Sequence, residues 1–110
     1  MSIEETIREQ INSHPVLIYM KGNPNQPQCG FSARATQILM ACGQKFAFVD
    51  ILSNPDIRAN LPAVSEWPTF PQLFVDGELV GGCDIMTEMF ESGELKKLLD
   101  DSAAQREAQA

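Results

Sequence analysis

The chain has 110 residues, enough for one domain with one modest core, and its hydrophobic fraction of 44% is ordinary for a globular protein. Its net charge of −7 argues against a nucleic-acid partner, because phosphate binding needs a basic surface. The longest apolar run, Val16–Met20, is far too short to span a membrane, and the acidic opening residues do not resemble a signal peptide. These features predict a soluble, cytoplasmic protein.

The sequence contains three cysteines, Cys29, Cys42 and Cys83. This number is odd and too small for the disulfide framework of a secreted protein. In a reducing compartment we expect these residues to be free thiols, metal ligands or catalytic groups.

The N-terminal residues predict a helix and then a strand. A capping-box pattern, Ser-Ile-Glu-Glu at residues 2–5, is accompanied by isoleucines at helical spacing, so the helix should extend to about Asn12. Val16–Met20 is short, apolar and partly β-branched, which indicates a strand buried on both faces. Residues 21–28, KGNPNQPQ, have the composition of a loop.

A second helix is indicated by apolar side chains at the spacing i, i+3, i+4 and i+7: Ala35, Ile38, Leu39 and Cys42. Gly43 provides a C-terminal stop, and the helix should begin at or just after Cys29. Because Cys42 lies on the apolar face of this helix, we expect it in the core.

The next predicted elements are a strand and a third helix. Residues 45–51, KFAFVDI, predict the strand. The helix should be capped by Ser53 or Asn54, carry Pro55 at its first position and extend to about Leu61.

A hairpin follows, with strands at residues 72–75 and 78–80 joined by an Asp-Gly turn. Asp84 can cap a further helix, which Gly93 would end. Residues 94–99 predict one or two more helical turns.

The order of these elements predicts the fold class. A strand–helix–strand unit favours parallel strands with a right-handed crossover, and the hairpin adds antiparallel strands. We therefore predict an α/β, thioredoxin-like fold, in which helices flank a four-stranded mixed sheet. Residues 1–100 should form a single domain, and residues 101–110, which lack an apolar stripe, should be a disordered tail.

Cys29 is the main candidate for chemistry, because it follows a strand and a loop at the predicted start of a helix. The N–H groups and the positive end of the helix dipole favour a thiolate there, and Lys21 could add a positive charge. Ser32 stands where a C-x-x-C redox loop carries its second cysteine, and a hydroxyl cannot resolve a mixed disulfide. The alternatives are a buried, inert cysteine and a serine selected for helix capping.

Two further positions remain open on the residues alone. Cys83 lies near a predicted helix start and is a second reactive thiol, a backbone binding position or a bystander. A cis bond before Pro71 would free the backbone of Phe70 to pair with an extended ligand, but cis bonds are rare, so the sequence alone favours trans.

Several blocks of this sequence, YMKGNPNQPQCGFS, VDI…NPDIR and WPTFPQLFVDGELVGGCD, closely resemble the monothiol, CGFS-type glutaredoxins. The resemblance covers residues 4 to 100, and the length matches the single-domain bacterial form. It implies glutathione binding next to Cys29, which would be both the catalytic residue and the metal ligand. The family match assigns glutathione contacts to these residues: Lys21 and Arg58 for the glycine carboxylate, the Phe70 backbone before a cis Pro71 for the cysteinyl unit, and Cys83 and Asp84 for the γ-glutamyl end.

The resemblance also implies a carrier of iron–sulfur clusters. A 2Fe–2S cluster needs four thiolates, which two subunits would supply as two Cys29 residues and two glutathione molecules. The family forms this bridged homodimer, forms heterodimers with BolA-type proteins, and passes clusters to apoproteins. One alternative is a weak, glutathione-dependent oxidoreductase that reduces protein mixed disulfides through Cys29, alone or with Cys83 resolving. Another is a non-catalytic thioredoxin-like binding module.

Overall fold

The computed structural model describes residues 2–109. No helix in this range is long and apolar enough to cross a membrane. The elements follow one another in this order: α1 (Ile3–Ser13), β1 (Val16–Met20), β2 (Gly22–Asn23), β3 (Gln26–Pro27), α2 (Gly30–Cys42), β4 (Ala47–Asp50), α3 (Pro55–Ser65), β5 (Gln72–Val75), β6 (Glu78–Gly81), α4 (Cys83–Ser92) and α5 (Glu94–Gln109).

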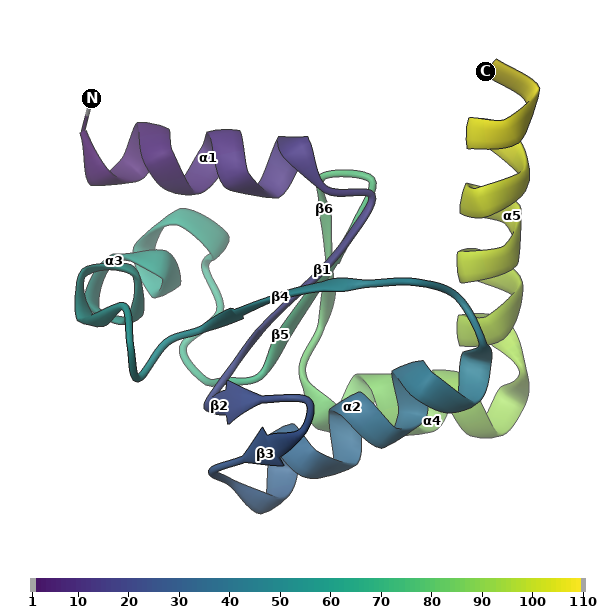
Figure 1. Cartoon of the computed structure of the whole chain (residues 1–110), viewed down its shortest axis with the longest axis horizontal. Coiled ribbons are helices and arrows are strands. Elements are labelled where there is room, and N and C mark those ends of the chain that lie inside the picture. Colours follow the sequence, from purple (N-terminus) through teal and green to yellow (C-terminus); the bar gives the residue numbers. More distant parts are fainter. Residues whose placement is uncertain (1, 110) are drawn as a thin grey trace.

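The main sheet has four strands in the order β4-β1-β5-β6. Strand β1 pairs in parallel with β4, with Met20 opposite Asp50, and antiparallel with β5. Strand β6 returns antiparallel along β5. Helices cover both faces of this mixed sheet (Figure 1), so the predicted thioredoxin-like α/β fold is confirmed.

Strand β1 separates two apolar clusters. All five of its residues are buried, as predicted for a strand covered on both faces. Val16, Ile18 and Met20 belong to the cluster with α2, α4 and α5, whereas Leu17 and Tyr19 belong to the cluster with α1 and α3. This alternation follows from the two-residue period of a strand.

The turn between β5 and β6 is formed by Asp76 and Gly77, as the sequence predicts. Both residues have positive φ angles, 51° for Asp76 and 83° for Gly77. A two-residue hairpin turn needs this conformation because it matches the twist of the flanking strands, and Asp-Gly adopts it readily.

Two segments are more regular than the sequence predicts. Residues 21–28 are not a plain loop, because β2 and β3 pair within them. The side chain of Asn23 stabilises the connection, since its Oδ1 accepts hydrogen bonds from the N–H groups of Asn25 and Gln26, both at 2.9 Å. Helix α3 extends past Leu61 to Ser65 despite Pro62, because Leu61 and Val64 pack against the apolar cluster beneath it.

The prediction of a disordered tail is wrong for residues 101–109, which continue α5. Ser102 is 3% exposed, and its hydroxyl donates to Asp76 Oδ1 at 3.0 Å. Arg106 Nη1 donates to Ser102 Oγ at 2.6 Å. The contact is polar, so an analysis based on apolar stripes does not detect it. Residue 110, in the predicted tail, and residue 1, in the predicted domain, lie outside the described residues.

A chain that ends at Asp100 should therefore be less stable than the full chain. Losing the Ser102–Asp76 hydrogen bond should lower the free energy of unfolding by about 1 kcal/mol. Urea denaturation measures the change, and a chain that ends at Glu107 is the control, because it keeps Ser102 and Arg106. Equal stability of all three chains would show that residues 101–109 contribute nothing.

Candidate functional site

Cys29 occupies the N-cap position of α2, so the predicted helix start is confirmed. Its carbonyl accepts the first helical hydrogen bond, from the N–H of Ala33 at 2.9 Å. The side chain is partly exposed and is a free thiol. Cys29 is therefore not the buried, inert cysteine of the alternative interpretation.

The environment of Cys29 lowers the pKa of its thiol. The largest cause is the backbone N–H of Ser32, and the N–H of Phe31, the charge of Lys21 and the Ser32 hydroxyl act in the same direction. Partial burial opposes them without reversing the shift. Although Sγ makes no capping hydrogen bond of standard geometry within the described chain, the first turn of α2 favours the thiolate, as a helix N-terminus should.

Ser32 has a structural role as well as replacing a second cysteine. It is fully buried, and its Oγ accepts a hydrogen bond from the backbone N–H of Lys21 at 3.1 Å. Ser32 therefore joins the end of β1 to the first turn of α2. The sequence contains no local signal for this contact, because the two residues come from separate elements.

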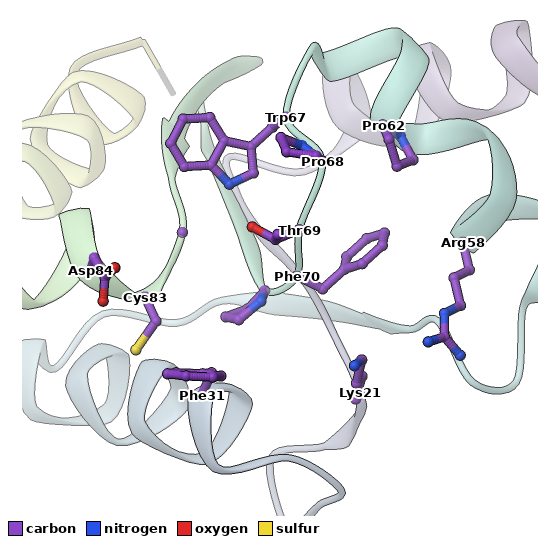
Figure 2. Close-up of a pocket in the computed structure, with 12 residues that line it drawn as sticks. Lys21, Phe31, Arg58, Pro62, Trp67, Pro68, Thr69, Phe70, Cys83 and Asp84 are labelled. Atoms are coloured by element: carbon purple, nitrogen blue, oxygen red, sulfur yellow. The ribbon is translucent and has the colours of Figure 1, made fainter.

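A pocket of about 610 Å³ opens beside the start of α2 (Figure 2). It brings together all five residues that the resemblance assigns to glutathione, from four separate segments of the chain: Lys21, Arg58, Phe70, Cys83 and Asp84. Cys29 does not line this pocket, but Phe31, two residues later, does and is 63% exposed. Cys29 is thus two residues away from a side chain that lines the pocket.

The charges of the pocket are separated. Lys21 and Arg58 lie on one side, and Cys83 and Asp84 lie on the opposite side (Figure 2). Within residues 2–109, neither Lys21 nor Arg58 forms an ion pair, whereas other cations of the chain, such as Arg8 and Lys97, do. The pocket is therefore suited to a ligand with a negative group at one end and a positive group at the other.

The loop before β5 forms the wall between these charges. The Phe70–Pro71 bond is cis, which the family resemblance implies and the sequence alone disfavours. No backbone hydrogen bond outside the helices and strands uses Phe70 within the described part of the chain. Its backbone groups are therefore available to an extended ligand.

Gln72 holds this loop, and the sequence analysis missed it. The side chain is fully buried, and its Nε2 donates to the carbonyls of Trp67 at 2.8 Å and Thr69 at 3.1 Å. A glutamine inside an otherwise apolar strand, QLFV, is the signal that could have revealed it, because a buried amide needs partners.

The start of α4 differs from the prediction. Gly82 is the N-cap, and Asp84 lies in the first turn without acting as a side-chain cap. The Asp84 carboxylate is exposed and faces the pocket region, and the first residue of the helix is Cys83. Asp84 is thus free to contact a ligand.

Cys42 is 3% exposed, as predicted for a core residue, and burial raises the pKa of its thiol. Among residues 2–109, no group of three or more His, Cys, Asp or Glu side chains could hold a metal ion.

The fold is thioredoxin-like, with a four-stranded mixed sheet flanked by helices and Cys29 at the start of α2. A sequence model described as "Glutaredoxin" matches residues 16–80. "Glutaredoxin 4" of Escherichia coli K12 is 63% identical over 100 residues, covering 91% of this chain and 87% of that protein. "Glutaredoxin 4" of Pasteurella multocida is 62% identical over 104 residues, covering 94% and 95%.

Solved structures agree with these sequence matches. The solution structure of reduced poplar apo GrxS14 is 43% identical, has a TM-score of 0.79 and covers 94% of each chain. The chain belongs to the glutaredoxin family. With its single cysteine in CGFS and its similarity to proteins named Glutaredoxin 4, it fits the monothiol, single-domain form.

The thiol of Cys29 should remain reactive at pH values where an ordinary cysteine is protonated. Because its pKa is lowered, the thiolate is lost only when the pH falls through that lower value. The rate of alkylation by iodoacetamide, followed across pH in a Cys42→Ser, Cys83→Ser background, measures this. The same protein in urea gives the ordinary thiol for comparison, and coincident pH profiles in the two states would contradict the assignment.

Proposed function

We propose that this protein binds glutathione and carries a 2Fe–2S cluster bridged between two subunits, for transfer to apoproteins. The observation that supports it most is a partly exposed thiol of lowered pKa, Cys29, two residues before a side chain that lines a pocket with separated charges. Glutathione has two carboxylates, one ammonium group and a thiol, and the pocket offers complementary groups in that arrangement.

The ligand count supports a bridged assembly. One subunit supplies one thiol of lowered pKa at this site, Cys29, and one bound glutathione would add a second. Two subunits then provide the four thiolates that a 2Fe–2S cluster needs. The lack of any internal metal-binding group among residues 2–109 is consistent with ligands from a second subunit and from glutathione.

The same arrangement defines how glutathione would bind. Lys21 and Arg58 would hold the glycine carboxylate, and the planar guanidinium suits a forked contact. The free backbone of Phe70 would pair with the cysteinyl unit, and Cys83 and Asp84 would hold the γ-glutamyl end near the start of α4. This direction brings the glutathione thiol toward Cys29.

The partners follow from this proposal. The cluster-bound form would be a homodimer or a heterodimer with a BolA-family protein, and the acceptors would be apo forms of iron–sulfur proteins. We further propose a cytoplasmic location, in which all three cysteines would remain free thiols.

A second candidate function is glutathione-dependent reduction of protein mixed disulfides. The lowered pKa of Cys29 favours it, because thiolates attack disulfides. Ser32 opposes a strong activity, since the chain lacks a resolving thiol one helical turn away. We therefore expect this activity to be weak.

Cluster binding should require Cys29 alone among the three cysteines. After anaerobic reconstitution with iron, sulfide and glutathione, the parent should be a brown dimer, and Cys29→Ser should be colourless and monomeric. Cys42→Ser and Cys83→Ser, measured in parallel, should still bind cluster. Absorbance and size-exclusion chromatography follow both properties, and full cluster retention by Cys29→Ser would refute the proposal.

Reversing the charge of Lys21 or Arg58 should weaken glutathione binding. Each Glu variant should raise the dissociation constant about tenfold or more, because a charge-assisted contact is replaced by repulsion. The loss should be larger at low salt, where exposed charges are less screened. Calorimetry measures the affinity, and Lys45→Glu is the control, because Lys45 is exposed and does not line the pocket. Unchanged affinity in both pocket variants would show that Lys21 and Arg58 are solvated surface residues with no role in glutathione binding.

A further inference from the structure

Asp50 lies at the carboxyl end of β4 and binds two segments that lead to the pocket cations. Its Oδ1 accepts hydrogen bonds from the N–H of Gly22 at 3.0 Å and the N–H of Leu52 at 2.8 Å. Its Oδ2 accepts a hydrogen bond from the hydroxyl of Ser53 at 3.0 Å. Asp50 does not line the pocket itself.

The first of these segments carries Lys21. Gly22 follows it with a φ of +86°, and a Cβ atom there would lie 2.5 Å from the carbonyl oxygen of Gln26. Glycine permits this backbone conformation. In it, the Gly22 N–H donates its hydrogen bond to Asp50. Lys21 is thus held on one side by Ser32, through its own N–H, and on the other by Asp50, through the next residue.

The second segment leads to Arg58. Leu52 and Ser53, both bound by the Asp50 carboxylate, form the connection from β4 to α3. The Asn54 side chain donates to the backbone carbonyl of Asp50 at 2.9 Å, and the Asn54 carbonyl accepts from the N–H of Arg58 at 3.1 Å. A short chain of hydrogen bonds therefore connects Asp50 to the helical turn that carries Arg58.

The Asp50 carboxylate has two acceptor oxygens for these hydrogen bonds. Burial acts to raise the pKa of Asp50, but the N–H groups of Leu52 and Gly22 and the Ser53 hydroxyl outweigh it, so the pKa is lowered overall. A carboxylate accepts several hydrogen bonds at once, so one side chain can bind both segments.

We propose that Asp50 is a positioning residue, which sets Lys21 and Arg58 in the arrangement that recognises a carboxylate of the ligand. The inference rests on the proposed binding of glutathione at this pocket. It adds a role for a residue that contacts neither the pocket nor the thiol.

Positioning and simple charge predict opposite effects. A negative charge near Lys21 and Arg58 repels an anion, so removal of Asp50 should strengthen binding if only its charge mattered. If Asp50 acts by positioning, its removal should weaken binding despite that lost repulsion. The direction of the change therefore distinguishes the two explanations.

The test compares three variants by calorimetry with reduced glutathione. Asp50→Ala should raise the dissociation constant about tenfold, the scale of one hydrogen bond to a charged group. Asp50→Asn should remain within about twofold of the parent, because its amide oxygen still accepts from Gly22 and Leu52. Asp56→Ala is the charge control: Asp56 is exposed in the first turn of α3, and its carboxylate makes no hydrogen bond within residues 2–109, so binding should be unchanged or tighter.

A double-mutant cycle adds a measurement that distinguishes positioning from a general loss of protein stability. In an Arg58→Ala background, Asp50→Ala should have a smaller effect than in the parent, because one of the two residues that it positions is absent. If Asp50→Ala fails to fold, Asp50→Ser provides the comparison with a smaller change, because its hydroxyl keeps one polar group at this position. The expectation of near-parental affinity for Asp50→Asn is unaffected.

The outcomes separate this inference from the function on which it rests. Weaker binding by Asp50→Ala, restored in Asp50→Asn, supports positioning. Parental or tighter binding by Asp50→Ala, while Lys21→Glu and Arg58→Glu bind weakly, overturns the inference and leaves glutathione binding intact. Unchanged affinity of the Lys21→Glu and Arg58→Glu variants overturns the proposed site itself.

Discussion

Both helical layers of this protein pack against β1, whose five residues are at most 2% exposed. Successive side chains of β1 point to opposite faces of the sheet and pack into two different apolar clusters. A shift of β1 by one residue would therefore move each side chain into the other cluster. Pairing with β4 on one side and β5 on the other fixes the strand further. The position of Lys21, the residue after β1, is consequently determined by the core. The geometry of the pocket therefore depends on the position of β1.

The pocket forms where the parallel strands β1 and β4 end, at their carboxyl edge, which is where open α/β sheets commonly bind ligands. Lys21 follows one strand directly, and Arg58 follows the other through the connection that Asp50 organises. The opposite wall comes from the cis-proline loop, which Gln72 holds from inside the sheet. Rigid elements thus position loop groups that are free to contact a ligand.

The acidic character of the chain makes these local contacts more important. With a net charge of −7, the whole molecule repels an anion at long range, and salt screens that repulsion. Binding of a carboxylate then depends on close contacts with Lys21 and Arg58, which have no ion-pair partner among residues 2–109. Asp84, on the far side of the pocket, offers the complementary charge for an ammonium group.

The sequence alone determined the order of the main elements, the burial of β1 on both faces, the hairpin turn at Asp76 and the start of α2 at Cys29. Each depends on local periodicity, capping or turn chemistry, which neighbouring residues carry. The family motifs indicate the site residues. These residues lie in one pocket only because four distant segments of the chain fold together. The tertiary structure alone decided the roles of Ser32, Asp50 and Gln72 and the helical end of α5. These residues are polar, and their partners lie in other elements, so no spacing rule along the chain could reveal contacts that exist only after the sheet and helices have packed.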